Sequence, residues 1–201
     1  MLHLIKGLDH PREAALVASM LADRKRVFVD LLGWDVPHDG TIERDEFDHD
    51  DSEYLIFARG DDHIASVRLL RTDRRHLLGS VFPELCEGDV PGGPDIREIS
   101  RFCISPRHRG EVRLQARRLL ATALTEYALL NGLSAYTAVA HVSRMSNLFA
   151  TGWRIRSLGL PDMGADHPAA ALMIEIDSAT PHLLQRSGRY EHQPLHFAMA
   201  A

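Results

Sequence analysis

The feature that most constrains the fold is a run of strand, helix and strand in the middle of the chain. Residues 96–105 (IREISRFCIS) alternate between apolar and polar side chains, as a half-buried strand does. Residues 111–131 carry apolar side chains at helical spacing, and Gly132 suits the position after a helix. Residues 134–141 (SAYTAVAH) then form a second apolar strand. This order predicts a right-handed crossover unit, in which the two strands are parallel.

The segments around this crossover predict a mixed, mostly antiparallel sheet with helices on its faces. Residues 11–29 place apolar side chains at helical spacing, and Pro11 suits a first helical turn. A hairpin and two further strands are predicted by four β-rich runs: 53–59, 64–72, 153–160 and 170–177. The fold class is therefore α+β. This order of elements resembles the GCN5-related N-acyltransferase fold, which implies a cleft beside the central strands, where the pantetheine arm of an acyl carrier enters.

The composition excludes several classes of protein. With 45% hydrophobic and 25% charged residues, the chain is expected to fold as a single domain over residues 1–201. It has no apolar run long enough to cross a bilayer and no N-terminal targeting signal, so we expect a cytoplasmic protein without a membrane span. Cys86 and Cys103 are too few for a disulfide framework or a zinc site. Residues from about 190 to 201 carry no periodicity, which predicts a loosely held tail.

The net charge of -5 hides a strong asymmetry along the chain. Between Asp35 and Asp62 there are eleven acidic residues and two arginines, whereas between Arg107 and Arg118 there are five arginines and one glutamate. Such a separation indicates two faces with different roles, although a solvated loop and a solvated helix are the alternative. Nucleic acid is disfavoured as a partner, because the basic run is short and has no interleaved aromatic residues for base stacking.

The acidic stretch also fails as a metal site. A calcium loop that begins at Asp48 would need Gly at its sixth position and Glu at its twelfth, and the chain has Glu53 and Arg59 there. We therefore expect no metal. Arg68 lies inside an apolar strand, where a guanidinium without a carboxylate partner is costly. The sequence predicts a polar network that lines a cleft, formed by Arg24, Arg68 and Arg101 with Asp45 and Asp48.

Five motifs in order resemble the acyl-homoserine-lactone synthases, the bacterial autoinducer synthases. They are VFV…LGWDV, ERDEFD, ASVRLL, VFPEL and REISRFCIS, and the similarity runs from about residue 20 to about residue 180. The resemblance implies a transfer of an acyl chain from acyl carrier protein, or from acyl-CoA, to the amine of S-adenosylmethionine. Lactone closure then releases methylthioadenosine and yields a quorum-sensing signal. S-adenosylmethionine is a substrate in this reaction, so we expect no separate cofactor.

The resemblance implies that the chemistry of the family falls on a small set of residues of this chain. The implied catalytic residues are Arg24, Asp45, Asp48, Arg68, Glu98 and Arg101, and those implied to bind S-adenosylmethionine are Phe28, Trp34, Asp45, Arg101 and Phe102. Glu98 is the candidate base for the amine, with a structural ion pair to Arg101 as the alternative. Phe28 and Trp34 would enclose the sulfonium, and ordinary core packing is their alternative. The oxyanion would be held by backbone amides near residues 100–103 or by a neighbouring cation.

The acyl chain and its carrier are predicted to meet two further sets of residues. The acyl pocket is expected from Ala138, Ala140, Met145, Leu148 and Phe149, for which core packing is the alternative. By similarity, members that prefer 3-oxo chains carry a hydroxyl side chain in this strand, and Ala140 stands in its place, which favours an unsubstituted chain. Carrier docking is expected from the basic residues Arg107, Arg109, Arg113, Arg117 and Arg118, because carrier proteins are strongly acidic.

Two other functions stay open on the sequence. An amine N-acetyltransferase that uses acetyl-CoA would carry a glycine-rich phosphate loop, and the run RHRGEV matches that loop only at Arg107 and Gly110. A non-catalytic module that binds an acyl carrier would not need Glu98 or the arginine cluster. The resemblance therefore favours the autoinducer synthase.

Overall fold

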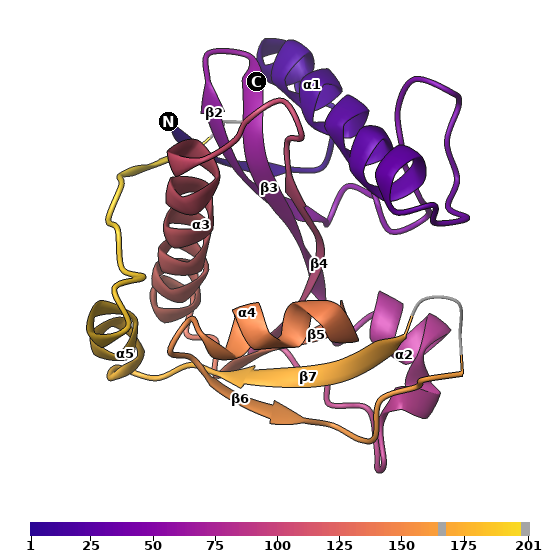
Figure 1. The fold of residues 1–201 in the computed structure, drawn as a ribbon, viewed down its shortest axis with the longest axis vertical. Helices are drawn as coiled ribbons and strands as arrows, with labels where there is room; N and C mark the ends of the chain where they lie inside the picture. Colours follow the sequence, from indigo (N-terminus) through magenta and orange to yellow (C-terminus); the bar gives the residue numbers. More distant parts are fainter. Residues whose placement is uncertain (165–167, 198–201) are drawn as a thin grey trace. The chain divides into compact units, whose positions relative to one another are not determined.

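The computed structural model describes residues 1–164 and 168–197 (Figure 1). The chain divides into two compact units, and each is made of segments that are distant in the sequence. Unit 1 comprises residues 1–69, 101–123 and 191–201, and unit 2 comprises residues 70–100 and 124–190. That the chain acts as a single domain stays a prediction.

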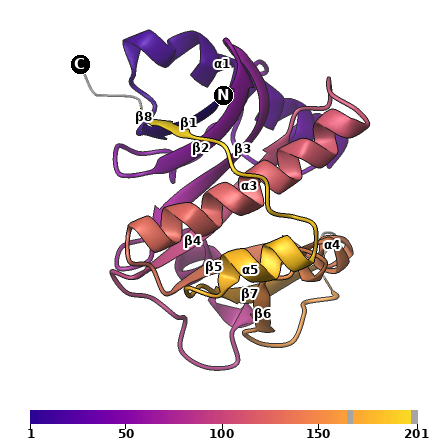
Figure 2. The same ribbon diagram turned by 90° about the vertical axis from the view of Figure 1, so that its left-hand side faces the viewer.

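Unit 1 contains strands in the order β3-β2-β1-β8. Their bounds are Leu2–Lys6 for β1, Glu53–Arg59 for β2, Asp62–Arg71 for β3 and Leu195–Phe197 for β8. β1 and β3 run antiparallel to β2, so the predicted hairpin is confirmed. β8 pairs with β1 in the parallel sense, and Figure 2 shows it lying beside β1.

The first helical segment packs an apolar face on this sheet, but it is not one continuous α-helix. It consists of a 3-10 turn (Pro11–Glu13), α1 (Ala14–Arg24) and the π-helix η2 (Lys25–Leu31). The buried cluster between helix and sheet contains Ile5, Leu16, Val17, Met20, Leu21, Tyr54, Ile56 and Ala58. Because neighbours along a strand point to opposite faces, Phe57 of β2 faces away from α1. On that face it lines a cavity with Leu119 of α3 (Glu111–Leu130).

Unit 2 contains strands in the order β6-β7-β5-β4, and β4 belongs to it only up to Ser100, because residues 101–104 of that strand are part of unit 1. Their bounds are Ile96–Ile104 for β4, Ala135–His141 for β5, Arg154–Ser157 for β6 and Ala169–Glu175 for β7. β4 and β5 are parallel neighbours, as the crossover predicts, but their pairing covers only four positions, from Ile96↔Ala135 to Ile99↔Ala138. β7 pairs antiparallel with both β5 and β6.

Short helices complete unit 2. They are α2 (Leu77–Val81), η3 (Pro83–Leu85), η4 (Val142–Arg144), α4 (Met145–Phe149) and α5 (Thr180–Arg186). Leu78 and Leu85 form a buried cluster with Ala171 of β7, and Phe82 and Val139 pack against it. The sequence predicts neither α2 nor α5, because five to seven residues are too few to show a helical period.

The C-terminal segment is attached rather than loose as far as the structure describes it. The Tyr190 hydroxyl donates to Glu126 at 2.7 Å, and the backbone N–H of Glu191 donates to Thr122 Oγ1 at 2.8 Å. β8 follows and pairs with β1. These contacts differ from the predicted loose tail, of which residues 198–201 lie outside the described residues. Among the described helices, none has both the length and the apolar character needed to cross a bilayer.

Candidate functional site

Three arginines and three carboxylates form one buried cluster in unit 1, which we call the paired network. Its members are Arg24 of α1, Arg68 of β3, Arg101 of β4, and Glu43, Asp45 and Asp48 from the loop before β2. Three positive and three negative charges balance within it. The sequence predicts the grouping of the arginines with Asp45 and Asp48, and the structure adds Glu43 as the third carboxylate.

Arg24 holds two of the carboxylates at once. Its Nε donates to Glu43 Oε2 at 2.6 Å, while Nη1 and Nη2 donate to the two oxygens of Asp48 at 2.8 Å each. The second contact is the bidentate geometry in which guanidinium and carboxylate pair most strongly. The hydroxyl of Tyr54 also donates to Asp48 Oδ1, at 2.7 Å. The sequence gives no signal for Tyr54, since an aromatic residue in a strand is ordinary.

Arg68 and Arg101 share the remaining carboxylate. Arg68 donates through Nη1 and Nη2 to the two oxygens of Asp45, at 2.5 and 3.1 Å. Arg101 donates to Asp45 Oδ2 at 2.6 Å and to Glu43 Oε1 at 3.0 Å. The side chains of Asp45 and Arg101 are each 7% exposed, whereas the other four members are at most 1% exposed. Solvent or a ligand therefore reaches the paired network at Asp45 and Arg101.

In the fully buried part of the network, the neighbouring charges keep Asp48 ionised and Tyr54 protonated. Burial opposes ionisation of Asp48, but hydrogen bonds from Arg24 and the charges of Arg24 and Arg68 outweigh it and hold the pKa of that carboxyl well below its usual range. Burial, and then the charge of Asp48, raise the pKa of the Tyr54 hydroxyl. In the part of the chain that the structure describes, no group of three or more His, Cys, Asp or Glu side chains is arranged to hold a metal ion.

An aromatic pair lies at the accessible side of the network. The π-helix η2 carries Phe28 and ends near Gly33, whose positive φ of 67° reverses the chain. Trp34 then stacks on Phe28, with the ring centroids 4.9 Å apart and the planes 17° apart. The guanidinium carbon of Arg101 lies 5.4 Å from the Phe28 centroid, which is cation–π geometry. Single turns of π-helix are frequent at functional sites, because they turn a side chain out of the α-helical register.

Arg101 has an unusual backbone for a strand residue. Its φ of 50° lies in the left-handed region, and it is the one non-glycine residue with positive φ among the described residues. Such a conformation costs energy in a residue with a Cβ, and it interrupts the alternation of side chains along β4. The next residue, Phe102, which the resemblance assigns to S-adenosylmethionine, is 42% exposed.

Glu98 lies in unit 2, where it is fully buried. Its two carboxylate oxygens accept hydrogen bonds from the backbone N–H groups of Leu77 and Leu78, at 2.7 and 2.9 Å. These are the first two residues of α2, so the carboxylate caps that helix. Arg101, the alternative partner that the sequence offers, makes its ion pairs with Glu43 and Asp45.

Two neighbours of Glu98 and α2 carry buried polar atoms without a hydrogen bond. Thr137 is the register partner of Glu98 on β5, and its Oγ1 is unpaired. His76 precedes α2; its Nδ1 contacts the carbonyl oxygen of Arg74 at 2.8 Å, and its Nε2 is unpaired. The sequence pattern does not single out His76, whereas a hydroxyl inside the apolar run SAYTAVAH is a signal that points to Thr137.

The residues predicted for the acyl pocket lie on β5 and α4 of unit 2. Ala138 is buried, and Ala140, Met145 and Leu148 are partly buried. Phe149 is 49% exposed, so core packing does not account for it. Their role in binding an acyl chain stays a prediction.

The five basic residues predicted for carrier docking differ in their contacts. Arg107 donates to Asp23 Oδ2 at 2.8 Å and also pairs with Asp62. Arg113 donates to the carbonyl oxygen of Ser105 at 3.2 Å, and Arg118 lies 3.8 Å from Glu111. Arg109 is exposed, and Arg117 is partly buried. Arg107 therefore forms its ion pairs inside unit 1, and carrier docking by the five residues stays a prediction.

A buried hydrogen-bonded chain that the sequence does not reveal joins α1 to β3. Asp23 Oδ2 lies 2.9 Å from His63 Nδ1, and His63 Nε2 lies 2.9 Å from Ser66 Oγ. Burial lowers the pKa of His63 below its ordinary value, although Asp23 acts in the opposite direction. All three side chains are at most 1% exposed, so these hydrogen bonds support the fold and a substrate cannot reach them.

Comparison with known proteins relates this chain to one family. A family model described as autoinducer synthase matches residues 9–184. An acyl-homoserine-lactone synthase from Ralstonia nicotianae is 32% identical over 173 residues, which are 83% of this chain and 85% of the relative. The solved structure of TofI in a ternary complex with an inhibitor and MTA has 29% identity and a TM-score of 0.76, over 92% of this chain and 96% of that one.

A more distant structure shows the same fold over nearly the whole chain. It is that of a CoA-dependent acyl-homoserine lactone synthase, BjaI, with SAM and isopentyl-CoA. The identity is 24%, the TM-score is 0.85, and the match covers 98% of this chain and 92% of that one. The α+β, N-acyltransferase-like fold class predicted from the sequence is thereby confirmed.

Proposed function

The chain belongs to the autoinducer synthase family, and from that premise we propose how it carries out its reaction. Its relatives are acyl-homoserine-lactone synthases, so the chain is an acyltransferase. We propose that it moves an acyl chain from acyl carrier protein or acyl-CoA to the amine of S-adenosylmethionine. The carboxylate of the acylated product then attacks its own γ-carbon, closes the lactone and releases methylthioadenosine. Both substrates would be met in the cytoplasm.

The observation that carries this proposal is the paired network with the Phe28–Trp34 pair at its accessible side. S-adenosylmethionine is a cation with a carboxylate, and Asp45 and Arg101 are the two network members that a ligand can reach. The carboxylate of Asp45 would stabilise the sulfonium, and Arg101 would pair with the carboxylate of the substrate. The faces of Phe28 and Trp34 would hold the sulfonium and adenosine by cation–π attraction and stacking. Phe102 would add an exposed apolar wall.

Acylation requires that the amine lose a proton, because an α-amine has a pKa of about 8. Glu98 is the proposed base, directly or through one water molecule. Its two hydrogen bonds from the start of α2 fix the direction of the carboxylate, as a base in a defined geometry requires. Lactone closure makes a different demand: the leaving thioether is neutral and needs no acid, so the site has to hold a curled conformation of the intermediate.

The acyl chain is proposed to lie along β5 and α4, against Ala138, Ala140, Met145, Leu148 and Phe149. The pairing of β4 with β5 covers four positions only, so the remaining residues of β5 have one edge without a β4 partner, which suits entry of a pantetheine arm. Ala140 favours an unsubstituted chain.

The reaction is tested with purified protein, S-adenosylmethionine and matched donors that carry the same chain, hexanoyl-CoA and hexanoyl carrier protein. Mass spectrometry should detect hexanoyl-homoserine lactone and methylthioadenosine in equal amounts. Glu98→Gln should lower kcat by roughly 10²–10⁴-fold, while Glu84→Gln, at an exposed glutamate of the same unit, should leave it unchanged. If no donor yields an acylated lactone, the proposal is wrong.

The nature of the donor is tested by charge reversal on α3. If the carrier protein docks on the basic residues, Arg113→Glu with Arg117→Glu should raise KM for the carrier-bound donor at low salt. The same change should affect KM less at high salt, where surface charges are screened. Loss of activity with both donors at every salt concentration would contradict a docking role.

A further inference from the structure

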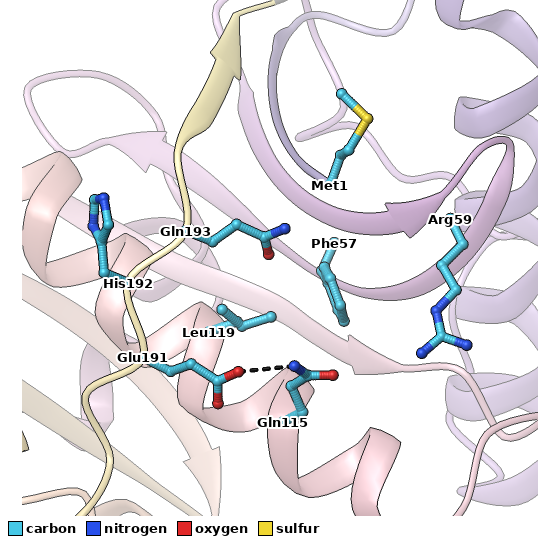
Figure 3. A pocket seen from close by; sticks show the side chains of 8 residues that line it. All are labelled: Met1, Phe57, Arg59, Gln115, Leu119, Glu191, His192 and Gln193. Atoms are coloured by element: carbon cyan, nitrogen blue, oxygen red, sulfur yellow. Dashed lines mark hydrogen bonds between the residues drawn. The ribbon is translucent and has the colours of Figure 1, made fainter.

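Among the described residues, buried polar atoms without a hydrogen-bond partner occur in both units. In unit 1, Gln193 Oε1 is one of them, and Figure 3 shows this residue at the edge of a hollow in which Gln115 donates to Glu191 at 2.8 Å. In unit 2, His76 Nε2 is another, and His76 directly precedes the helix that holds Glu98. The second atom bears on the reaction, because its residue adjoins the donors of the proposed base.

The imidazole ring of His76 is held in one orientation. Its Nδ1 lies 2.8 Å from the carbonyl oxygen of Arg74. A carbonyl oxygen can only accept a hydrogen bond, so Nδ1 carries the hydrogen and the neutral ring has its lone pair on Nε2. Because Nε2 has no partner among the described residues, the hydrogen bond of Nδ1 is the polar contact that fixes the ring.

Gly79, in the first turn of α2, provides the space for this ring. A Cβ at this position would lie 2.8 Å from Cε1 and 3.0 Å from Nε2 of His76. Both distances are shorter than van der Waals contact, so a larger residue would push the ring away from the position in which Nδ1 reaches Arg74. Glycine inside a helix is less favourable than alanine. It therefore weakens α2 as a helix but lets the ring lie against it.

His76 also determines where α2 begins. It is the N-cap residue, with φ of -141° and ψ of 166°, and its carbonyl oxygen accepts from the backbone N–H of Ser80 at 3.0 Å. A helix of five residues is too short to form by its own propensity, so its first turn depends on such contacts. The next two N–H groups, of Leu77 and Leu78, bind the two carboxylate oxygens of Glu98. The direction of that carboxylate therefore depends on how His76 is held.

We propose that His76 is a positioning residue for Glu98 in acyl transfer and that Gly79 is required for this role. The inference rests on the proposed function, in which Glu98 takes the proton of the substrate amine. His76 itself touches no substrate. The ring fixes the start of α2, and the two N–H groups there orient the carboxylate and stabilise its charged form. Without that hold, the carboxylate turns away from the amine, and its protonated form is favoured.

Two substitutions of His76 test which ring nitrogen matters. Asn places an amide N–H near the position of Nδ1 and can keep the hydrogen bond to Arg74, whereas Gln places its amide near the position of Nε2 and loses that bond. His76→Gln should lower kcat by about ten- to a hundredfold with little change in KM for S-adenosylmethionine. It should also move the acid limb of the kcat–pH profile to higher pH. His76→Asn should restore most of both properties, and His182→Gln, at an exposed histidine of unit 2, is the control.

Gly79→Ala displaces the same ring from the other side. Helical propensity alone predicts that this change stabilises α2. If the ring has no role, the variant should therefore be at least as active as the unchanged protein. We expect instead a lower kcat and the same movement of the acid limb. Ser80→Ala, at the next exposed position of the helix, is the matched control and should change neither.

Amide hydrogen exchange at Leu77 and Leu78 gives a readout that needs no turnover. Exchange of these two amides should be faster in His76→Gln and Gly79→Ala than in the unchanged protein, and close to normal in His76→Asn and Ser80→Ala. If the unchanged protein forms no acylated lactone, the proposed function is wrong, and exchange still decides whether His76 holds the start of α2. Normal exchange together with a normal pH profile in His76→Gln, or equal impairment in His76→Gln and His76→Asn, would overturn the inference.

Discussion

Two buried polar regions of this protein, the paired network and the surroundings of Glu98, differ in how their polar groups are hydrogen-bonded. In the paired network of unit 1, three arginines and three carboxylates satisfy one another, and Tyr54 adds a further hydrogen bond. Around Glu98 in unit 2, the carboxylate accepts hydrogen bonds from two backbone N–H groups, while the buried atoms Thr137 Oγ1 and His76 Nε2 have no hydrogen-bond partner among the described residues.

The two regions differ in the free energy of unfolding that is lost when a side chain is removed, and in the hydrogen-bonding capacity that stays unused. Buried charges that pair only with one another leave the remaining charge uncompensated when one member is removed, so the paired network should tolerate little change. Neutral polar atoms without a partner already carry their desolvation penalty, so removing one should cost nothing. The first region is suited to holding a fixed geometry, and the second retains hydrogen-bonding capacity for a substrate or a water molecule.

The largest effect is expected from Arg68→Met in the paired network. It leaves Asp45 and Asp48 buried with one positive charge fewer, and it should lower the free energy of unfolding by about 3–5 kcal/mol, measured by urea denaturation. Arg71→Met on the same strand breaks a partly exposed ion pair with Asp73 and should cost at most about 1 kcal/mol. Equal losses in the two variants would refute the contrast.

A smaller loss is expected from Glu98→Gln. The amide nitrogen that replaces one carboxylate oxygen would face a backbone N–H of Leu77 or Leu78, so one donor loses its acceptor. The free energy of unfolding should fall by about 1–3 kcal/mol. Glu84→Gln, at an exposed position, serves as the control and should leave stability unchanged. A stable Glu98→Gln protein would mean that the carboxylate does not support α2.

His63 is buried and hydrogen-bonded, but unlike the hydroxyl groups it is ionisable. It therefore allows a test in which the pH is varied. Burial lowers its pKa, so in the unfolded chain the imidazole takes up a proton at a higher pH than in the folded protein. Stability should therefore decrease as the pH falls below about 6.5. His63→Asn, measured by denaturation at several pH values, should show a flatter dependence than the exposed-site control His38→Asn. Parallel pH dependences would contradict this assignment.

The smallest effect is expected from Thr137→Val. It removes a buried hydroxyl that has no partner and keeps the shape of the side chain, so stability should stay the same or rise slightly. The matched control is Thr125→Val, because Thr125 Oγ1 accepts a hydrogen bond from Trp153 Nε1 at 3.0 Å. That control should lose about 1 kcal/mol or more. A clear loss of stability in Thr137→Val would show that its hydroxyl is not idle.

Local pattern and charge balance predicted much of the fold and part of the site. The crossover of β4, α3 and β5 follows from hydrophobic period, and the partners of Arg68 follow from the cost of an unpaired charge in a strand. The same reasoning could not assign Glu43 to the network over its many acidic neighbours, because composition does not say which carboxylates point inward.

Other features depend on contacts between distant residues and leave no local signal. The π-helix that presents Phe28 and the positive φ of Arg101 are backbone departures that no residue preference would suggest. β8 has only three residues, and it is a strand because β1 offers it an edge. The chain Asp23–His63–Ser66 joins residues about 40 positions apart, so spacing could not predict it.

The pairing of β1 with β8 has a consequence for how the protein is made. Leu2 pairs with Leu195, so the edge of β1 stays open on the ribosome until nearly all of the chain has been synthesised, a delay of about 10–40 s. An open strand edge invites pairing with other chains. If the gene were shortened so that translation stops before Leu195, the edge of β1 would stay open in the finished product. Such a product should accumulate in inclusion bodies even though it retains every residue of the paired network.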